Sequence, residues 1–143
     1  MNIREFKIED KTAIIALWKE CELVVPWNNP NQDIERKLKI DPDLFLVGEE
    51  NGEIVATAMG GYEGHRGWIN YLAVGKNHRH RGYGKEIMTE IEKRIEAKGC
   101  PKINLQIRQT NLDVIAFYKS IGYLDDHVIG LGKRLKDDNP FDG

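Results

Sequence analysis

The stretch from Asn77 to Glu86, NHRHRGYGKE, combines residue types that bind phosphate groups in proteins. It holds three long cationic side chains, namely Arg79, Arg81 and Lys85. Their charges and multiple N–H donors attract anions, and an arginine can hold one with two parallel hydrogen bonds. The two glycines, Gly82 and Gly84, lack a Cβ, so an anion can approach the backbone closely. The stretch therefore predicts a site for a phosphorylated ligand.

The position of this stretch in the chain strengthens that prediction. A strand-like run ends at Val74, and a helix-like pattern begins near Gly82. The first N–H groups of a helix have no partner inside the helix, and the helix dipole adds a partial positive charge there. Such an end binds phosphate readily, so we expect a diphosphate at this turn.

Three phosphate-binding motifs can be compared with the stretch. A Walker A motif needs Ser or Thr after its Gly-Lys pair, whereas Glu86 follows here. The dinucleotide fingerprint G-x-G-x-x-G fails because Ile87 stands at its third glycine. The pattern [RQ]-x-x-G-x-[GA] is met by residues 79–84. A solvated basic loop is the plainer alternative for the two arginines.

The periodicity of apolar residues predicts the elements that position this turn. Alternating runs predict strands, and periods of 3.6 residues predict helices. We expect strands at 2–7, 44–50, 53–62, 67–75, 102–108 and 127–135, and helices at 10–20, 31–40, 82–98 and 112–123. The pair Asn51-Gly52 predicts a tight hairpin turn between the second and third strands.

The order of these elements predicts an α+β fold with a mixed, mostly antiparallel sheet and helices on both faces. Residues 67–108 form one central βαβ unit in this prediction, and the phosphate-binding turn lies inside it. A length of 143 residues suits one domain, which we place at residues 1–136. We expect the tail, residues 137–143, to be disordered.

Composition argues against several classes of protein. The net charge of −2 disfavours a molecule that binds nucleic acid over its whole surface. No apolar run reaches the roughly 20 residues that span a bilayer, and the first residues are too charged for a signal peptide. Cys21 and Cys100 are expected to be reduced thiols, and the HRH run has no third metal ligand nearby. We therefore expect a soluble, cytoplasmic protein without metal, nucleic-acid or membrane partners.

Two blocks, AVGKNHRHRGYGKEIM and NLDVIAFYKSIGY, resemble the GNAT superfamily of acetyl-CoA-dependent N-acetyltransferases. The first resembles the pyrophosphate-binding motif of that family, and the second resembles a later motif near the cofactor. The expected order of elements is similar to the GNAT fold over essentially the whole chain. The segments PWNNP, DIERK, GGYEGHRG and GCPKI further resemble the small stand-alone bacterial acetyltransferases of the YpeA type, whose acceptors are poorly defined.

The resemblance implies a set of residues that bind acetyl-CoA. The strand end would pair through its backbone with the pantetheine arm, and the amides of the turn would bind the pyrophosphate. The implied residues are Leu72, Ala73, Val74, Arg79, His80, Arg81, Gly82, Tyr83, Gly84, Lys85 and Asn111. Tyr118 matches the frequent general acid of the family, which protonates the departing CoA thiolate.

The reaction implied is direct attack of a free primary amine on the thioester. The backbone N–H of Val74 could polarise the thioester carbonyl, as an oxyanion donor does. The base that deprotonates the amine could be a water chain or a side chain, for which Glu63 is the first candidate and His65 the second. Asn70 and Tyr71 are candidates to line the acceptor cleft. The acceptor itself would be an amine-bearing small molecule or peptide.

These residues also have structural interpretations. Tyr118 could be ordinary core packing, and Asn111 could simply cap the helix that starts at Leu112. Glu63 and His65 could belong to a plain surface loop.

Three rival functions remain open. The first is a protein N-terminal or lysine acetyltransferase, and the second is a non-catalytic acyl-CoA-binding sensor on the same fold. The third is a nucleic-acid-binding module, which the net charge and the lack of interleaved aromatic residues disfavour. The oligomeric state is open as well, with a homodimer through edge strands or the C-terminal hairpin as one option.

Overall fold

The computed structural model describes residues 1–141 of the chain. The described residues divide into two compact units, one made of residues 1–104 with 138–141 and the other of residues 105–137. The single domain predicted over residues 1–136 stays a prediction.

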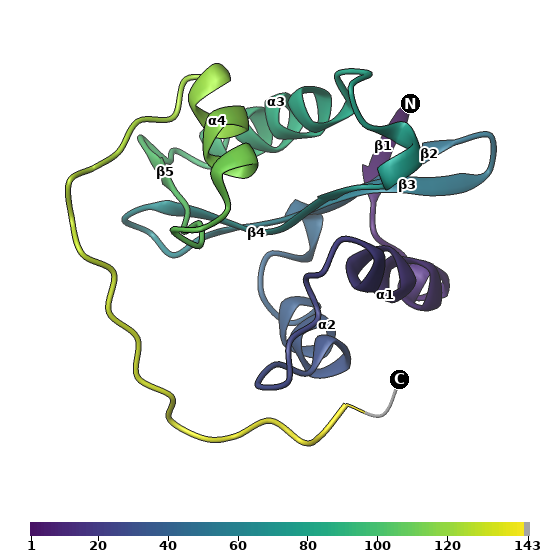
Figure 1. Cartoon of the computed structure of the whole chain (residues 1–143), viewed down its shortest axis with the longest axis horizontal. Helices are drawn as coiled ribbons and strands as arrows, with labels where there is room; N and C mark the ends of the chain where they lie inside the picture. The colour runs from purple at the N-terminus through teal and green to yellow at the C-terminus, as the bar shows by residue number, and fades with distance from the viewer. Residues whose placement is uncertain (142–143) are drawn as a thin grey trace. The chain divides into compact units, whose positions relative to one another are not determined.

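The first unit is built on a five-stranded sheet with the strand order β1-β2-β3-β4-β5. Its strands are β1 (Asn2–Glu5), β2 (Phe45–Glu50), β3 (Glu53–Tyr62), β4 (Gly67–Val74) and β5 (Ile103–Asn104). Its helices are α1 (Lys11–Glu20), α2 (Pro30–Lys37) and α3 (Tyr83–Glu96). Neighbouring strands are antiparallel except β4 and β5, which run parallel and are joined through α3. In Figure 1, α1 and α2 lie on one face of this sheet and α3 on the other. The predicted α+β fold with a βαβ unit is confirmed.

The hairpin between β2 and β3 turns where the sequence predicts it. Asn51 and Gly52 have φ angles of 53° and 78°, both in the left-handed region. Asparagine and glycine tolerate this region best, and a two-residue hairpin turn requires it. The turn brings Glu50 and Glu53 opposite each other and sets the register of the two strands.

The core on the α1 face contains stacked aromatic rings. Ile14 and Trp18 of α1 have no exposed surface, which confirms that the helical spacing marks the buried side. The Trp18 ring stacks on Phe45 with ring centroids 6.2 Å apart, and Phe45 stacks on Phe6 at 4.5 Å. Stacked rings bury much apolar area, so they hold α1 firmly against the sheet.

The opposite face of the sheet is covered by the apolar stripe of α3. Its inward residues have no exposed surface, and they are Ile87, Met88, Ile91 and Ile95. At Gly60 on β3, a Cβ would lie only 2.6 Å from Cδ1 of Ile91. The glycine therefore lets α3 lie close to the sheet.

The fourth strand has two irregularities. Thr57 pairs with Ala73 and Met59 with Asn70, so Ala58 faces two residues of β4 and the strand bulges. Tyr71 lies in this bulge with φ of 50°, which is uncommon for a bulky residue. Within residues 1–141, the ladder between β4 and β5 consists of the pairs at Gly67 and Trp68 only. The remainder of β4 is thus unpaired on the β5 side of the ladder.

Two strand predictions are wrong in extent. The strand expected at 102–108 is reduced to the two residues of β5, and no strand forms at 127–135. Ile129 and Leu131 are 87% and 91% exposed. Alternating apolar residues fit a pleated, half-buried surface, but they form a strand only where another strand supplies the ladder hydrogen bonds. The sequence pattern does not reveal whether such a partner is present.

The second unit, residues 105–137, contains the helix α4 (Leu112–Ser120). Asn111 precedes it, and its side-chain oxygen accepts a hydrogen bond from the amide of Val114 at 3.4 Å. The Tyr118 ring makes edge contacts with Phe117 at 5.2 Å and Tyr123 at 5.5 Å. These rings are the aromatic cluster of this unit.

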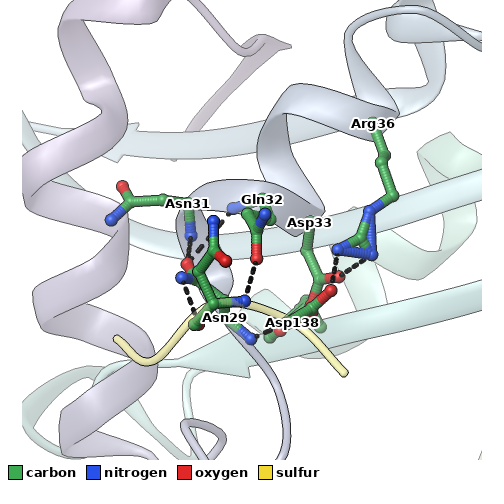
Figure 2. Close-up of polar contacts among 8 residues, drawn as sticks. Asn29, Asn31, Gln32, Asp33, Arg36 and Asp138 are labelled. Carbon is green, nitrogen blue, oxygen red and sulfur yellow. Dashed lines mark hydrogen bonds and ion pairs between the residues drawn. The ribbon is translucent and has the colours of Figure 1, made fainter. Parts of the chain in front are cut away.

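The end of the described chain contacts the start of α2, as Figure 2 shows. The side-chain amide of Asn29 donates to the backbone carbonyl of Asn139 at 2.9 Å, and the side chain of Gln32 accepts from the backbone amide of Asn139 at 2.8 Å. The carboxylate of Asp138 forms an ion pair with Arg36 and accepts a hydrogen bond from the backbone amide of Asn29 at 3.3 Å. These contacts involve part of the segment expected to be disordered, and the last two residues of that segment lie outside the described residues.

Candidate functional site

The turn between β4 and α3 is shaped by one glycine. After a short 3-10 turn at Lys76–His78, the chain reaches Gly82, the N-cap of α3, with φ of 81°. A Cβ built at Gly82 would meet no atom within 4 Å. The position therefore needs glycine for its backbone conformation, and it faces open space.

The first backbone amides of α3 are free of protein acceptors. No side chain caps the helix, and the first helical hydrogen bond runs from the Glu86 amide to the Gly82 carbonyl at 3.0 Å. Within residues 1–141, the amides of Tyr83, Gly84 and Lys85 have no acceptor from the chain. We call these three N–H groups the α3 cradle. They have the arrangement that binds an anion at a helix N-terminus.

Arg79 lies beside the α3 cradle but is held by the chain itself. Its Nε donates to the carbonyl of Val74 at 3.0 Å, and its Nη2 lies 3.5 Å from the sulfur of Cys21. The first contact fastens the turn to the end of β4, and the second joins it to the residue that follows α1. The side chain still places a positive charge near the turn, while His80, Arg81 and Lys85 are exposed.

A polar cluster around Glu50 supports the start of α3. The Tyr83 hydroxyl donates to one Glu50 oxygen at 2.7 Å, while His78 and Arg81 lie 3.5 and 3.7 Å from the other. The Tyr83 hydrogen bond, helped by Arg81 and His78, lowers the pKa of Glu50 below its ordinary value. The same hydrogen bond raises the pKa of Tyr83. The cluster ties the β2–β3 hairpin to the first turn of α3.

Sequence reasoning missed Glu50 and His78. Glu50 reads as an ordinary polar residue before the Asn51-Gly52 turn, and its partner Tyr83 is 33 residues away. No local pattern marks a contact of that separation. Tyr83, which the resemblance assigns to the ligand through its backbone, uses its side chain in this structural role.

The candidate strand for the pantetheine arm ends next to this turn. Ala73 is buried, and Leu72 and Val74 are half-buried. The Val74 carbonyl accepts from Arg79 and from the Cys21 thiol, the latter at 3.4 Å. Burial raises the pKa of Cys21, so its thiol keeps the proton that it donates here. The end of β4 is therefore held in place by two side chains.

Tyr71 contacts both helices on its face of the sheet. Its ring stacks on Trp18 with centroids 3.8 Å apart, and its hydroxyl donates to Asp33 of α2 at 2.6 Å. Burial and the Asp33 carboxylate raise the pKa of Tyr71 well above its ordinary value. Asn70, the other candidate for the acceptor cleft, is exposed.

Glu63 and His65 lie at the other end of β4 from Val74. The pair between Tyr62 and Gly67 places both in the loop that precedes β4. Seven residue steps separate Gly67 from Val74, roughly 23 Å along an extended strand. One Glu63 oxygen accepts hydrogen bonds from the amides of His65, at 3.0 Å, and Arg66. The structure thus does not bring Glu63 and His65 to the Val74 end of the strand.

The two candidates in the second unit have identifiable local roles. Asn111 caps α4, as the structural alternative for it predicts. Tyr118 is 6% exposed, and burial raises the pKa of its phenol above the ordinary value. A phenol in this state holds its proton at neutral pH, which is the form that a general acid requires.

Features of a metal site and of a membrane-spanning helix are absent from the described residues. Residues 1–141 contain no group of three or more His, Cys, Asp or Glu side chains arranged to hold a metal ion. None of the helices in this range combines the length and apolar character needed to cross a bilayer.

The sequence of the chain is similar to that of known proteins over nearly its whole length. The sequence profile described as "Acetyltransferase (GNAT) family" matches residues 12–123. An acetyltransferase of Pectobacterium atrosepticum is 50% identical over 141 residues, which cover 99% of this chain and 100% of that protein.

Two solved structures are similar in fold. A putative acetyltransferase from Agrobacterium tumefaciens matches with a TM-score of 0.77 at 20% identity, covering 94% of this chain and 99% of that one. The structure of AAC(6')-Iy in complex with the bisubstrate analogue CoA-S-monomethyl-acetylneamine matches with a TM-score of 0.76 at 18% identity. The latter match covers 93% of this chain and 97% of that one.

Proposed function

Because the chain belongs to the GNAT acetyltransferase family and is an acyltransferase, we propose that its donor is acetyl-CoA and its acceptor a primary amine. The acetyl group moves by direct attack of the amine on the thioester. No metal takes part in this scheme. The acceptor is an amine-bearing small molecule or a peptide, the latter through an N-terminal amine or a lysine. The cytoplasmic location and the homodimer stay predictions.

The α3 cradle is the observation that carries this proposal. Three consecutive amides without a protein acceptor suit a phosphate oxygen, and Gly82 leaves the space for it. Exposed Arg81 and Lys85 add the charge that a diphosphate needs. The residues present therefore fit the pyrophosphate of coenzyme A.

The fourth strand supports the binding of the pantetheine arm. Within residues 1–141, β4 has no ladder partner on the β5 side beyond Trp68. Side chains bind the Tyr71 and Val74 carbonyls, and the other backbone groups on that side can pair with the amides of a ligand. The strand runs into the α3 cradle through the turn at Arg79. A ligand with a diphosphate and an extended amide chain matches both features.

The proposed reaction balances without a further reagent. The amine nitrogen forms a bond to the acetyl carbon, the carbon–sulfur bond breaks, and coenzyme A leaves as a thiolate. A backbone N–H such as that of Val74 stabilises the oxyanion. The amine loses one proton to water or to a base, and the thiolate gains one from Tyr118, which solvent then reprotonates. Water is the better base in this scheme than Glu63, which lies in the loop before Gly67, and Gly67 is roughly 23 Å from Val74 along β4.

An acceptor screen tests the proposal directly. Acetyl-CoA is mixed with the enzyme and a panel of polyamines, amino acids, aminoglycosides and peptides, and both CoA release and acetylated product are measured. We expect at least one amine to give equal amounts of CoA and acetylated amine. Tight binding of CoA with no turnover on any amine would instead favour a sensor.

Replacement of Tyr118 tests the assignment of the acid. Tyr118→Phe removes the hydroxyl and keeps the ring that contacts Phe117 and Tyr123. We expect kcat to fall about 100-fold with little change in the affinity for CoA. An unchanged kcat would remove Tyr118 from the mechanism.

A further inference from the structure

We propose that the Thr57 hydroxyl is a positioning group for acetyl transfer, because it holds the β4 bulge from which the thioester-binding backbone continues. This inference rests on the proposed function of the same site. Thr57 lies on β3, opposite Ala73, and was not among the residues that the sequence indicated. It acts through the backbone of β4.

The Thr57 side chain makes two hydrogen bonds and has no exposed surface. Its hydroxyl donates to the carbonyl of Tyr71 at 2.9 Å and accepts from the indole N–H of Trp18 at 2.9 Å. A hydroxyl has one donor, and because the oxygen of Thr57 accepts from the Trp18 indole N–H, that donor is left for the Tyr71 carbonyl. The bulge carbonyl is thus linked through Thr57 to α1.

The residue held in this way has an unfavourable backbone conformation. Tyr71 has φ of 50°, a region in which bulky residues persist only when their surroundings hold them. Three contacts from three elements supply that support: the Thr57 hydroxyl from β3, the Trp18 ring from α1 and the Asp33 carboxylate from α2. Only the Thr57 contact acts on the peptide group itself.

The bulge sets the direction of the backbone that follows it. Leu72, Ala73 and Val74 come directly after Tyr71, and these are the residues whose backbone would meet the ligand. At its other end this segment is held through the Val74 carbonyl by Arg79 and Cys21. Loss of the Thr57 hydrogen bond would loosen one end and leave the other held, so the backbone donor would shift relative to the bound thioester. A shift of about 1 Å can cost about 100-fold in rate.

Packing alone does not require a hydroxyl at this position. The surrounding core is aromatic and aliphatic, with Trp18, Phe45, Val47 and Met59 in one cluster. A valine has nearly the same shape as threonine, but it would leave the Trp18 N–H and the Tyr71 carbonyl without this partner. The hydroxyl is therefore explained by its hydrogen bonds with the Trp18 indole and the Tyr71 carbonyl.

A valine and a serine variant separate positioning from packing. Thr57→Val keeps the volume and removes the hydroxyl, whereas Thr57→Ser removes a methyl group and keeps the hydroxyl. We expect kcat to fall about 10- to 100-fold in Thr57→Val and to return to within about threefold of wild type in Thr57→Ser. The affinity for CoA should fall by a smaller factor than kcat in Thr57→Val, because the α3 cradle that would bind the diphosphate is untouched. Equal kcat values in the two variants would overturn the proposal.

A second measurement does not depend on activity. Hydrogen exchange of the backbone amides of residues 71–74, measured without ligand, should be about tenfold faster in Thr57→Val and near wild type in Thr57→Ser. Unchanged exchange in Thr57→Val would overturn the positioning role even if the enzyme lost activity. If exchange responds as expected but no amine is acetylated by the wild type, the proposed function fails and the structural role of Thr57 stands.

Discussion

Helices α2 and α3 begin in opposite ways. The first amides of α2 are bound by the chain, since the Asn29 side chain accepts from the amides of Asn31 and Gln32 at 3.0 and 3.2 Å. The backbone amide of Asn29 is bound as well, by the carboxylate of Asp138. At α3, Gly82 has no side chain to offer, and the next three amides have no acceptor within residues 1–141. Pro30 at the first position of α2 has no N–H to offer, so the two ends differ both in their backbone donors and in what the chain places against them.

That difference separates a structural helix start from one suited to a ligand. Capping by Asn29 stabilises the fold and leaves no amide for a guest. An uncapped start in open space forgoes that stabilisation and suits an external anion. The comparison therefore predicts that changes at Gly82 affect ligand binding, whereas changes at Asn29 and Asp138 affect stability.

The largest expected effect is on the affinity for CoA at Gly82. Gly82→Asp puts a carboxylate beside the α3 cradle, and we expect CoA to bind about 100-fold more weakly or worse, because like charges repel strongly there. Isothermal titration with CoA measures the change. Gly82→Asn is the neutral control of the same shape, and Gly99→Asp places the same carboxylate in a turn with φ of 94° beyond the far end of α3. If all three variants bind CoA equally well, the α3 cradle is not the phosphate site.

A smaller effect, on stability, is expected at Asn29. Asn29→Ala removes the cap of α2 and the hydrogen bond to Asn139, so the free energy of unfolding should fall by about 1 kcal/mol. Urea denaturation followed by circular dichroism measures this loss. The affinity for CoA should stay within about twofold of wild type. A large loss of CoA affinity in Asn29→Ala would contradict the division of roles between the two helices.

The smallest effect is expected at Asp138. Asp138→Ala removes the ion pair with Arg36, whose side chain is 51% exposed, and the long hydrogen bond from the backbone amide of Asn29. Solvent screening at Arg36 limits the loss from the ion pair to about 0.5 kcal/mol. Thermal unfolding of this variant beside Asp137→Ala, a neighbouring carboxylate, isolates the contribution of the pair. A shift in CoA affinity without a shift in stability would link the tail to the ligand site and weaken the comparison.

Local patterns were sufficient for much of the fold. The Asn51-Gly52 turn, the apolar stripe of α3 and the glycine before it are all defined by residues close together in sequence, and all form as predicted. The strand expected at 127–135 has an equally good alternation but does not form. A helix makes its hydrogen bonds within itself, whereas a strand depends on a partner that its own sequence does not describe.

The candidate site was predictable to a similar degree. Gly82 could be identified from its residue type, because a left-handed backbone conformation at a helix N-cap favours glycine. The assignment of Glu63 considered its residue type and nearness to a strand end, although the order of the expected strands already puts it in the loop before β4, at the opposite end from Val74. The contacts of Glu50 with Tyr83 and of Thr57 with Trp18 join residues 33 and 39 positions apart. Such contacts follow from packing and have no signature in one sequence.

The glycine at position 60 acts as a spacer of minimal thickness between two layers. Because Gly60 of β3 has no side chain, Ile91 packs directly against the backbone there, and α3 lies correspondingly close to the sheet. The amides proposed to bind the anion belong to the first turn of that same helix, so their height above the sheet depends on the absence of a single methyl group at Gly60.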